Sequence, residues 1–110
     1  MKRTPLPSRA RRLSPRSKRR EEEAAERFIV RGLVMARDRY CVAEKIVPQV
    51  TCGGPLDVDE IVGRGVGGDY LDPNNCNLLC RRHHDWKHAN PEAAHEVGLT
   101  RWSWEGPPER

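Results

Sequence analysis

The chain has 110 residues, 36% of them hydrophobic, and a formal net charge of +4. This length fits one small domain and excludes two ordinary ones, and so few apolar residues predict a core that is only marginally stabilising by itself. No apolar run approaches the roughly 18 residues of a membrane span, and none follows the basic N-terminus as in a secretion signal. We therefore expect a cytoplasmic protein, whose four Cys and four His favour metal binding over disulfides.

Positive charge is concentrated at the N-terminus. Residues 1–20 contain nine Lys or Arg and no acidic residue, which leaves eleven basic against sixteen acidic residues in the remainder. Residues 1–16 also contain three prolines and show no apolar periodicity, so we predict a disordered basic tail. The pattern fits an arm that contacts nucleic-acid phosphates or a tail that only aids solubility, and the lack of acidic residues favours the arm.

A helix is predicted over residues 17–40, with Ser17 as its N-cap. Three glutamates near its start and two arginines near its end suit the helix dipole. Its apolar residues form a stripe that we expect to face the core. The members of this stripe are Phe28, Ile29, Leu33, Met35, Ala36 and Tyr40.

Residues 41–104 are expected to form one small α+β unit, followed by a C-terminal tail at 105–110. The expected elements are an irregular stretch 40–55, a strand 56–62, a glycine-rich loop, a short strand 77–79, a helix 81–89, a helical turn 91–96, and a terminal strand or arm 99–104. Trp102 and Trp104 are expected to cover the small core rather than to stack on bases.

Cysteine and histidine spacing predicts a structural metal site. Cys80 and His83 lie one helical turn apart, so both side chains can reach one ion, and Cys41 with Cys52 supplies a second pair upstream. Together they form a Cys3His set suited to tetrahedral zinc, which would stabilise a small domain. The gap between Cys41 and Cys52 is wider than the usual spacing of two paired zinc ligands. Cys76 is either an alternative ligand or a small buried thiol.

A second group of ligand-type residues predicts another metal site. His84 and His88 are four residues apart and share one face of the expected helix, offset from His83. With Asp59 from the expected strand they would form a three-ligand site that leaves positions open for water and a phosphate oxygen.

The segment from Val58 to His88 resembles the HNH, or ββα-metal, nuclease motif. The whole chain is similar to the small HNH endonucleases encoded by bacteriophages. The matching parts, in the family's order, are the strand 58–61, the loop 64–68, Asn75 before Leu78-Leu79-Cys80, and His84 with His88. The resemblance implies a small α+β fold: a ββα-metal finger, here with a preceding helix and a structural zinc site.

The resemblance also implies roles for single residues. Asp59, His84 and His88 stand at the positions of the family's ligands for a divalent metal, which would be Mg, Mn, Zn or Ni. Asn75 stands where the family's residue steadies the strand and loop that carry the general base. Glu60 occupies the base position, where the family usually has His, and it is expected to activate the attacking water.

The resemblance, together with these residues, predicts a metal-dependent DNA endonuclease, and it implies a role in phage DNA processing or packaging in the host cytoplasm. The side chains expected to hold DNA phosphates are Arg64, Arg81, Arg82 and Lys87. The alternative is a catalytically weak or inactive zinc-stabilised DNA-binding module that acts with a packaging partner, for which a phage terminase is the candidate. A redox protein is disfavoured because the chain has no Cys-x-x-Cys.

Overall fold

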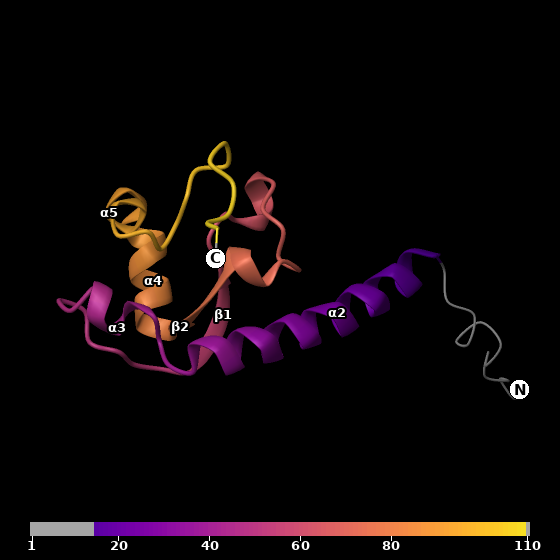
Figure 1. The fold of residues 1–110 in the computed structure, drawn as a ribbon, viewed down its shortest axis with the longest axis horizontal. Helices are drawn as coiled ribbons and strands as arrows, with labels where there is room; N and C mark the ends of the chain where they lie inside the picture. The colour runs from indigo at the N-terminus through magenta and orange to yellow at the C-terminus, as the bar shows by residue number, and fades with distance from the viewer. Residues whose placement is uncertain (1–14, 110) are drawn as a thin grey trace, which may run out of the picture.

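The computed structural model describes residues 15–109. The disorder expected for residues 1–14 therefore lies outside the described residues, whereas Pro15 and Arg16 already belong to a helix. The elements are α2 (Pro15–Asp38), α3 (Ala43–Ile46), β1 (Leu56–Glu60), η1 (Arg64–Val66), η2 (Pro73–Asn75), β2 (Cys76–Cys80), α4 (Arg81–Ala89) and α5 (Pro91–Glu96) (Figure 1). Among the described residues, no helix is long and apolar enough to cross a membrane.

The two strands form an antiparallel hairpin whose register places Leu56 opposite Cys80 and Glu60 opposite Cys76. Side chains of a strand point alternately to the two faces of a sheet. Val58 and Glu60 therefore share one face, and Asp59 belongs to the other. This hairpin and the helices around it confirm a small α+β architecture.

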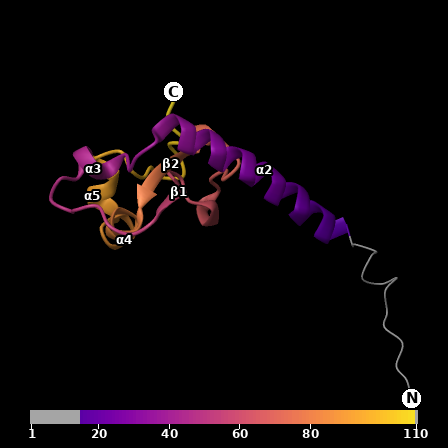
Figure 2. The same ribbon diagram turned by 90° about the horizontal axis from the view of Figure 1, so that it is seen from below.

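Each face of the hairpin contributes to a separate apolar cluster. On one face, two valines of α2 pack against the hairpin in a cluster that comprises Val30, Val34, Val58, Cys76 and Leu78. The other cluster joins the end of β2 to α3, α5 and the chain after it, and comprises Cys41, Ala43, Val47, Leu79, Cys80, Ala94 and Leu99. Figures 1 and 2 show α2 along one side of the hairpin and the shorter helices on the other.

The C-terminal half of α2 is attached to the body, and its N-terminal half projects beyond it (Figures 1 and 2). The Asp38 carboxylate accepts the Leu78 N–H at 3.0 Å, and Arg37 donates to the carbonyls of Pro73 and Cys76 at 2.9 and 2.6 Å. These bonds fix the last turn of the helix to β2. They leave the first turns with few contacts to the hairpin.

The prediction that the apolar stripe of α2 faces the core is wrong. The buried residues of α2 are Val30 and Val34, whereas Phe28, Leu33 and Tyr40 are 78%, 54% and 72% exposed. Ile29 and Met35 are also exposed, as is Ala36. The part of the domain that follows α2 is small and contacts only a narrow side of this helix. On that side two valines pack against the hairpin, and flanking charged residues bind backbone carbonyls.

Three local expectations are also corrected. The helix begins at Pro15, so Ser17 lies inside it, and residues 40–55 include the short helix α3. Residues 99–104 form bends, turns and irregular chain instead of a strand: the Arg101 backbone N–H and the Thr100 hydroxyl both donate to the carbonyl of Ile61, just after β1, so no ladder of hydrogen bonds forms. Trp104 is 80% exposed and does not cover the core, and Trp102 stacks on His95.

The loop between the strands is closed by Asn75. Its side chain accepts the Val62 N–H at 2.9 Å and donates to the carbonyls of Val62 and Asp69 at 3.0 and 3.1 Å. Gly68 must also be small, since a Cβ there would lie 1.7 Å from the Val62 carbonyl oxygen. These contacts connect the start of the loop, just after β1, with its middle and its end, and the steadying role implied for Asn75 stays a prediction.

Candidate metal centres

Cys41, Cys52, Cys80 and His83 converge on one point beside the second apolar cluster. The Nδ1 atom of His83 lies 3.4, 3.5 and 3.1 Å from the sulfurs of Cys41, Cys52 and Cys80, respectively. Tetrahedral zinc with ordinary bond lengths would separate sulfur from nitrogen by about 3.6 Å. All four donor atoms lie within 4.8 Å of one another, and the cysteines are free. This set could bind a metal such as zinc.

The surrounding backbone orients two of these ligands. The sulfur of Cys80 caps the N-terminus of α4 by accepting the His83 N–H. The Nε2 atom of His83 lies 3.3 Å from the Val47 carbonyl oxygen. A proton on Nε2 would satisfy that carbonyl and leave Nδ1 free to coordinate, as is usual for histidine ligands.

Two thiols of the four-ligand set, those of Cys80 and Cys52, have pKa values shifted in opposite directions. Burial alone would raise the pKa of Cys80, but hydrogen bonds from the backbone N–H groups of His83 and Gly53 and from the His83 ring lower it to about 6. Burial raises the pKa of Cys52 to about 12, assisted by its hydrogen bonds to Cys80 and Cys41. A metal that binds at neutral pH must therefore displace the Cys52 proton, so its affinity falls as the pH decreases.

Cys76 lies outside this cluster. It is fully buried on the α2 face of the hairpin, with its sulfur 3.8 Å from Nη1 of Arg27. Burial raises the pKa of its thiol, partly offset by the arginine. Of the two roles considered for Cys76, the structure supports the buried thiol.

Asp59, His84 and His88 form a second convergent set, on a side of α4 offset from that of His83. The Oδ1 atom of Asp59 lies 3.6 Å from Nε2 of His84 and 4.0 Å from Nε2 of His88. The Asp59 side chain is 7% exposed, whereas those of His84 and His88 are 33% and 62% exposed. One buried oxygen and two accessible nitrogens, all within 4.8 Å, form a site that opens toward solvent.

Lys87 is not available to contact DNA, which corrects its expected role. Its side chain is only 6% exposed, because α4 directs it beneath the set of Asp59, His84 and His88 toward β1. The ammonium donates to Oδ2 of Asp59 and, at 2.6 Å, to the Glu60 carbonyl oxygen. Lys87 therefore occupies one oxygen of Asp59 and leaves the other facing the two histidines.

Glu60 reaches the same region but is held by α2. Its Oε2 atom lies 3.3 Å from Nη2 of Arg27. The same nitrogen donates to the Val58 carbonyl at 3.4 Å, and Nη1 of Arg27 donates to the Tyr70 carbonyl at 2.5 Å. A hollow of about 300 Å³ connects Glu60 with the metal-ligand set and the loop; it is lined by Val58, Asp59, Glu60, Gly63, Arg64, Gly65, His84 and His88. The sequence contained no signal for Arg27, which is 33 residues from its partner.

The three arginines expected at phosphates are at the surface. Arg64 packs over the Tyr70 ring, 4.2 Å from its centre, at the rim of the hollow. Arg81 is exposed and pairs with Asp85 at 3.3 Å, one turn along α4. Arg82, also exposed, lies against Gly53, so its position is tied to the loop that carries Cys52.

Comparisons with protein-family models, curated proteins and solved structures found no match. The functional argument therefore depends on the two metal-ligand sets and their surroundings.

Proposed function

We propose that this chain is a metal-dependent DNA endonuclease of the HNH, or ββα-metal, type. The observation that carries the proposal is the convergence of Asp59, His84 and His88 at an open hollow that Glu60 and Arg64 also line. The order of elements supports it, because an antiparallel hairpin leads directly into the helix that bears both histidines.

The side chains of Asp59, His84 and His88 fit a divalent metal ion that keeps some coordination positions open for exchangeable ligands. Two imidazole nitrogens and one carboxylate oxygen suit Zn, Ni or Mn, and the carboxylate also permits Mg. When bound, such an ion would supply a Lewis acid for a phosphate oxygen. The buried four-ligand set suits a structural zinc, because its four protein ligands complete a tetrahedron and leave no position for substrate.

The side chains around the hollow would supply the other functions of the site, which are proton acceptance and phosphate binding. Glu60 would accept a proton from the attacking water, and Arg27 would hold the carboxylate in place. Arg64 at the rim, with Arg81 and Arg82 at the start of α4, would bind phosphates without reading bases. The basic residues at the projecting start of α2 would add further phosphate contacts.

Replacing His84 by alanine should reduce plasmid cleavage by at least about 100-fold, because the ion would lose one of three protein ligands. The assay follows nicked and linear products with Mg, Mn, Ni and Zn in turn. His95→Ala is the matched control, since His95 pairs with Glu105 outside the cluster and its loss should leave the rate unchanged. Absence of cleavage by the unaltered chain with every metal would rule out the nuclease.

Glu60→Gln should slow cleavage by roughly 10²- to 10⁴-fold while metal binding, measured by titration calorimetry, stays near its original strength. The amide preserves size but cannot accept the proton from water. Glu26→Gln, at an exposed glutamate of α2, is the control. Cleavage at the original rate would remove Glu60 from the mechanism.

The alternative function is a zinc-stabilised DNA-binding module without catalysis. The observation that favours it is the engagement of both carboxylates, Glu60 by Arg27 and Asp59 by Lys87. This module would bind DNA with salt-dependent affinity and leave plasmid intact under all metals, and it would serve a packaging partner such as a terminase.

A further inference from the structure

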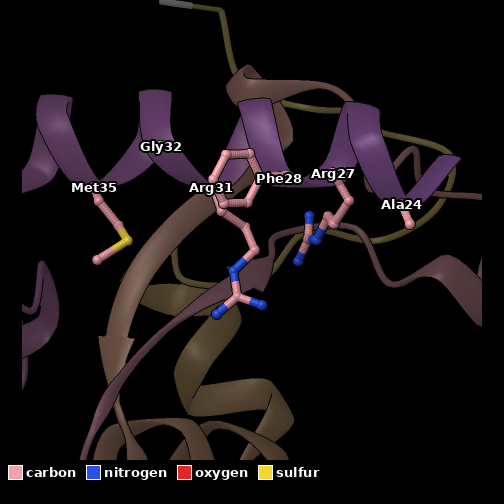
Figure 3. A pocket seen from close by; sticks show the side chains of 6 residues that line it. All are labelled: Ala24, Arg27, Phe28, Arg31, Gly32 and Met35. Atoms are coloured by element: carbon pink, nitrogen blue, oxygen red, sulfur yellow. The ribbon is translucent and has the colours of Figure 1, made fainter. Parts of the chain in front are cut away.

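Tyr70 connects α2 with the glycine-rich loop beside the hollow. Its hydroxyl donates to Oε2 of Glu23 at 2.5 Å, and its carbonyl accepts a hydrogen bond from Nη1 of Arg27 at 2.5 Å. Glu23 and Arg27 are one turn apart on the side of α2 that also carries the buried Val30 and Val34. Figure 3, a close view along α2, shows Arg27 extending from the helix toward the strands. The helix therefore holds both the hydroxyl and the backbone of Tyr70.

The ring of Tyr70 in turn contacts Arg64. The Cζ atom of Arg64 lies over this ring, 4.2 Å from its centre, and Arg64 lines the hollow that contains the Asp59, His84 and His88 set. A guanidinium over an aromatic face is attracted to it without using its N–H donors. Among residues 15–109, no carboxylate forms an ion pair with Arg64. Its N–H groups are therefore available to an anion at the rim of the hollow.

We propose that Tyr70 is a positioning residue that holds the Arg64 guanidinium at the rim of the hollow, where it binds a DNA phosphate. This inference rests on the proposed function, because it takes DNA as the substrate. Arg64 is exposed, and four of the residues 63–68 are glycines, so the side chain and its loop would sample many arrangements without the ring. Holding the guanidinium in place before DNA arrives reduces the entropy lost on binding.

Two other roles for Tyr70 fit these contacts less well. Direct contact with a phosphate is disfavoured, because the hydroxyl is already bound to the Glu23 carboxylate, which would repel an anion. Closing the loop does not require the ring either, since the Asn75 side chain already binds Val62 and Asp69. The ring contact with Arg64 is the part of the arrangement that these roles leave unexplained.

A double-mutant cycle on DNA binding tests the proposal. The Kd of a labelled duplex oligonucleotide is measured by fluorescence anisotropy, with the full-length, zinc-loaded chain and no further divalent ion added. Arg64→Ala should raise the Kd about tenfold, because one charged phosphate contact is lost. Tyr70→Leu should raise it about threefold, since Arg64 keeps its charge but must be ordered on binding. Both changes together should raise it about tenfold, like Arg64→Ala alone, because the ring acts only through Arg64.

Three further variants make the cycle specific. Tyr70→Phe should stay within about twofold of the original Kd, because it keeps the ring that Arg64 contacts. Arg64→Lys keeps the charge but not the planar group, so it should weaken binding about threefold. Tyr40→Leu is the matched control and should leave the Kd unchanged, since Tyr40 is 72% exposed and lies outside the hollow. Circular dichroism checks the fold of each variant, and Arg64→Lys changes only an exposed side chain.

An increase of roughly thirtyfold in the double variant, the product of the two single effects, would show that Tyr70 acts independently of Arg64 and would overturn the proposal. Unchanged affinity in Arg64→Ala or Arg64→Lys would also overturn it, as would absence of duplex binding by the unaltered chain. The plasmid assay decides the nuclease separately. A chain that shows the expected cycle but cleaves no plasmid would retain the role of Tyr70 in DNA binding and reject only the catalytic activity.

Discussion

Cys80→Ser should abolish stoichiometric zinc binding and leave residues 41–99 without cooperative thermal unfolding. The thiol is at once a ligand of the four-ligand set and the N-cap of α4, so its loss affects both the ion and the helix. Structural zinc contributes apparent binding free energies of about 10–16 kcal/mol in small zinc domains, which is comparable to the whole stability of an ordinary domain. Metal analysis and calorimetric melting measure the two effects.

Cys76→Ser provides the matched control for this substitution. Cys76 is as deeply buried as Cys80 but lies on the α2 face of the hairpin, outside the four-ligand set. It should retain one tightly bound zinc and lose roughly 1–3 kcal/mol, the cost of placing a hydroxyl in an apolar cluster. If Cys80→Ser keeps its zinc and melts like Cys76→Ser, the four-ligand set is not a metal site.

With zinc in the four-ligand set and no divalent ion added for the Asp59, His84 and His88 set, Lys87→Met should destabilise the chain by about 3–5 kcal/mol, because it leaves the buried Asp59 carboxylate without its ammonium. The same change should tighten the binding of a divalent metal to Asp59, His84 and His88, since the Lys87 ammonium no longer competes for Asp59. Urea unfolding and titration with Ni or Mn measure the two effects, and their opposite signs distinguish this role from simple packing.

Two further variants make the Lys87 result specific. Lys45→Met, at an exposed lysine of α3, should change stability by no more than about 0.5 kcal/mol. Asp59→Asn combined with Lys87→Met should recover part of the lost stability, because the unpaired charge is removed. Equal metal affinity in Lys87→Met and the unaltered chain would show that the ammonium does not compete with the ion.

Local spacing in the sequence predicted the ligands at α4 in both sets. Cys80 with His83, and His84 with His88, lie within one or two turns of a helix whose bounds matched the prediction, so their relative directions follow from helical geometry. Asp59 was placed correctly because side chains alternate along a strand. Cys41 and Cys52 joined the set through chemistry, since no other described cysteine remained except Cys76.

Contacts between distant segments could not be predicted in this way. The orientation of α2 depends on which narrow side meets the hairpin. Its large apolar residues indicated the wrong side, because Phe28, Leu33 and Met35 are exposed and the buried residues are two valines. Lys87 was expected to hold DNA phosphates together with three arginines of the same region. Its burial depends on a carboxylate 28 residues away, and neither composition nor periodicity reports such a pairing.

The adjacency of His83 and His84 affects how chelator experiments must be interpreted. One residue belongs to the buried four-ligand set and the next to the solvent-facing set, so both depend on the same turn of α4. A strong chelator that extracted an ion from the four-ligand set would also displace His84, and any activity would vanish whether or not the chemistry needs a metal. Loss of activity in chelator is therefore uninformative unless an ion bound to the four-ligand set is shown to remain.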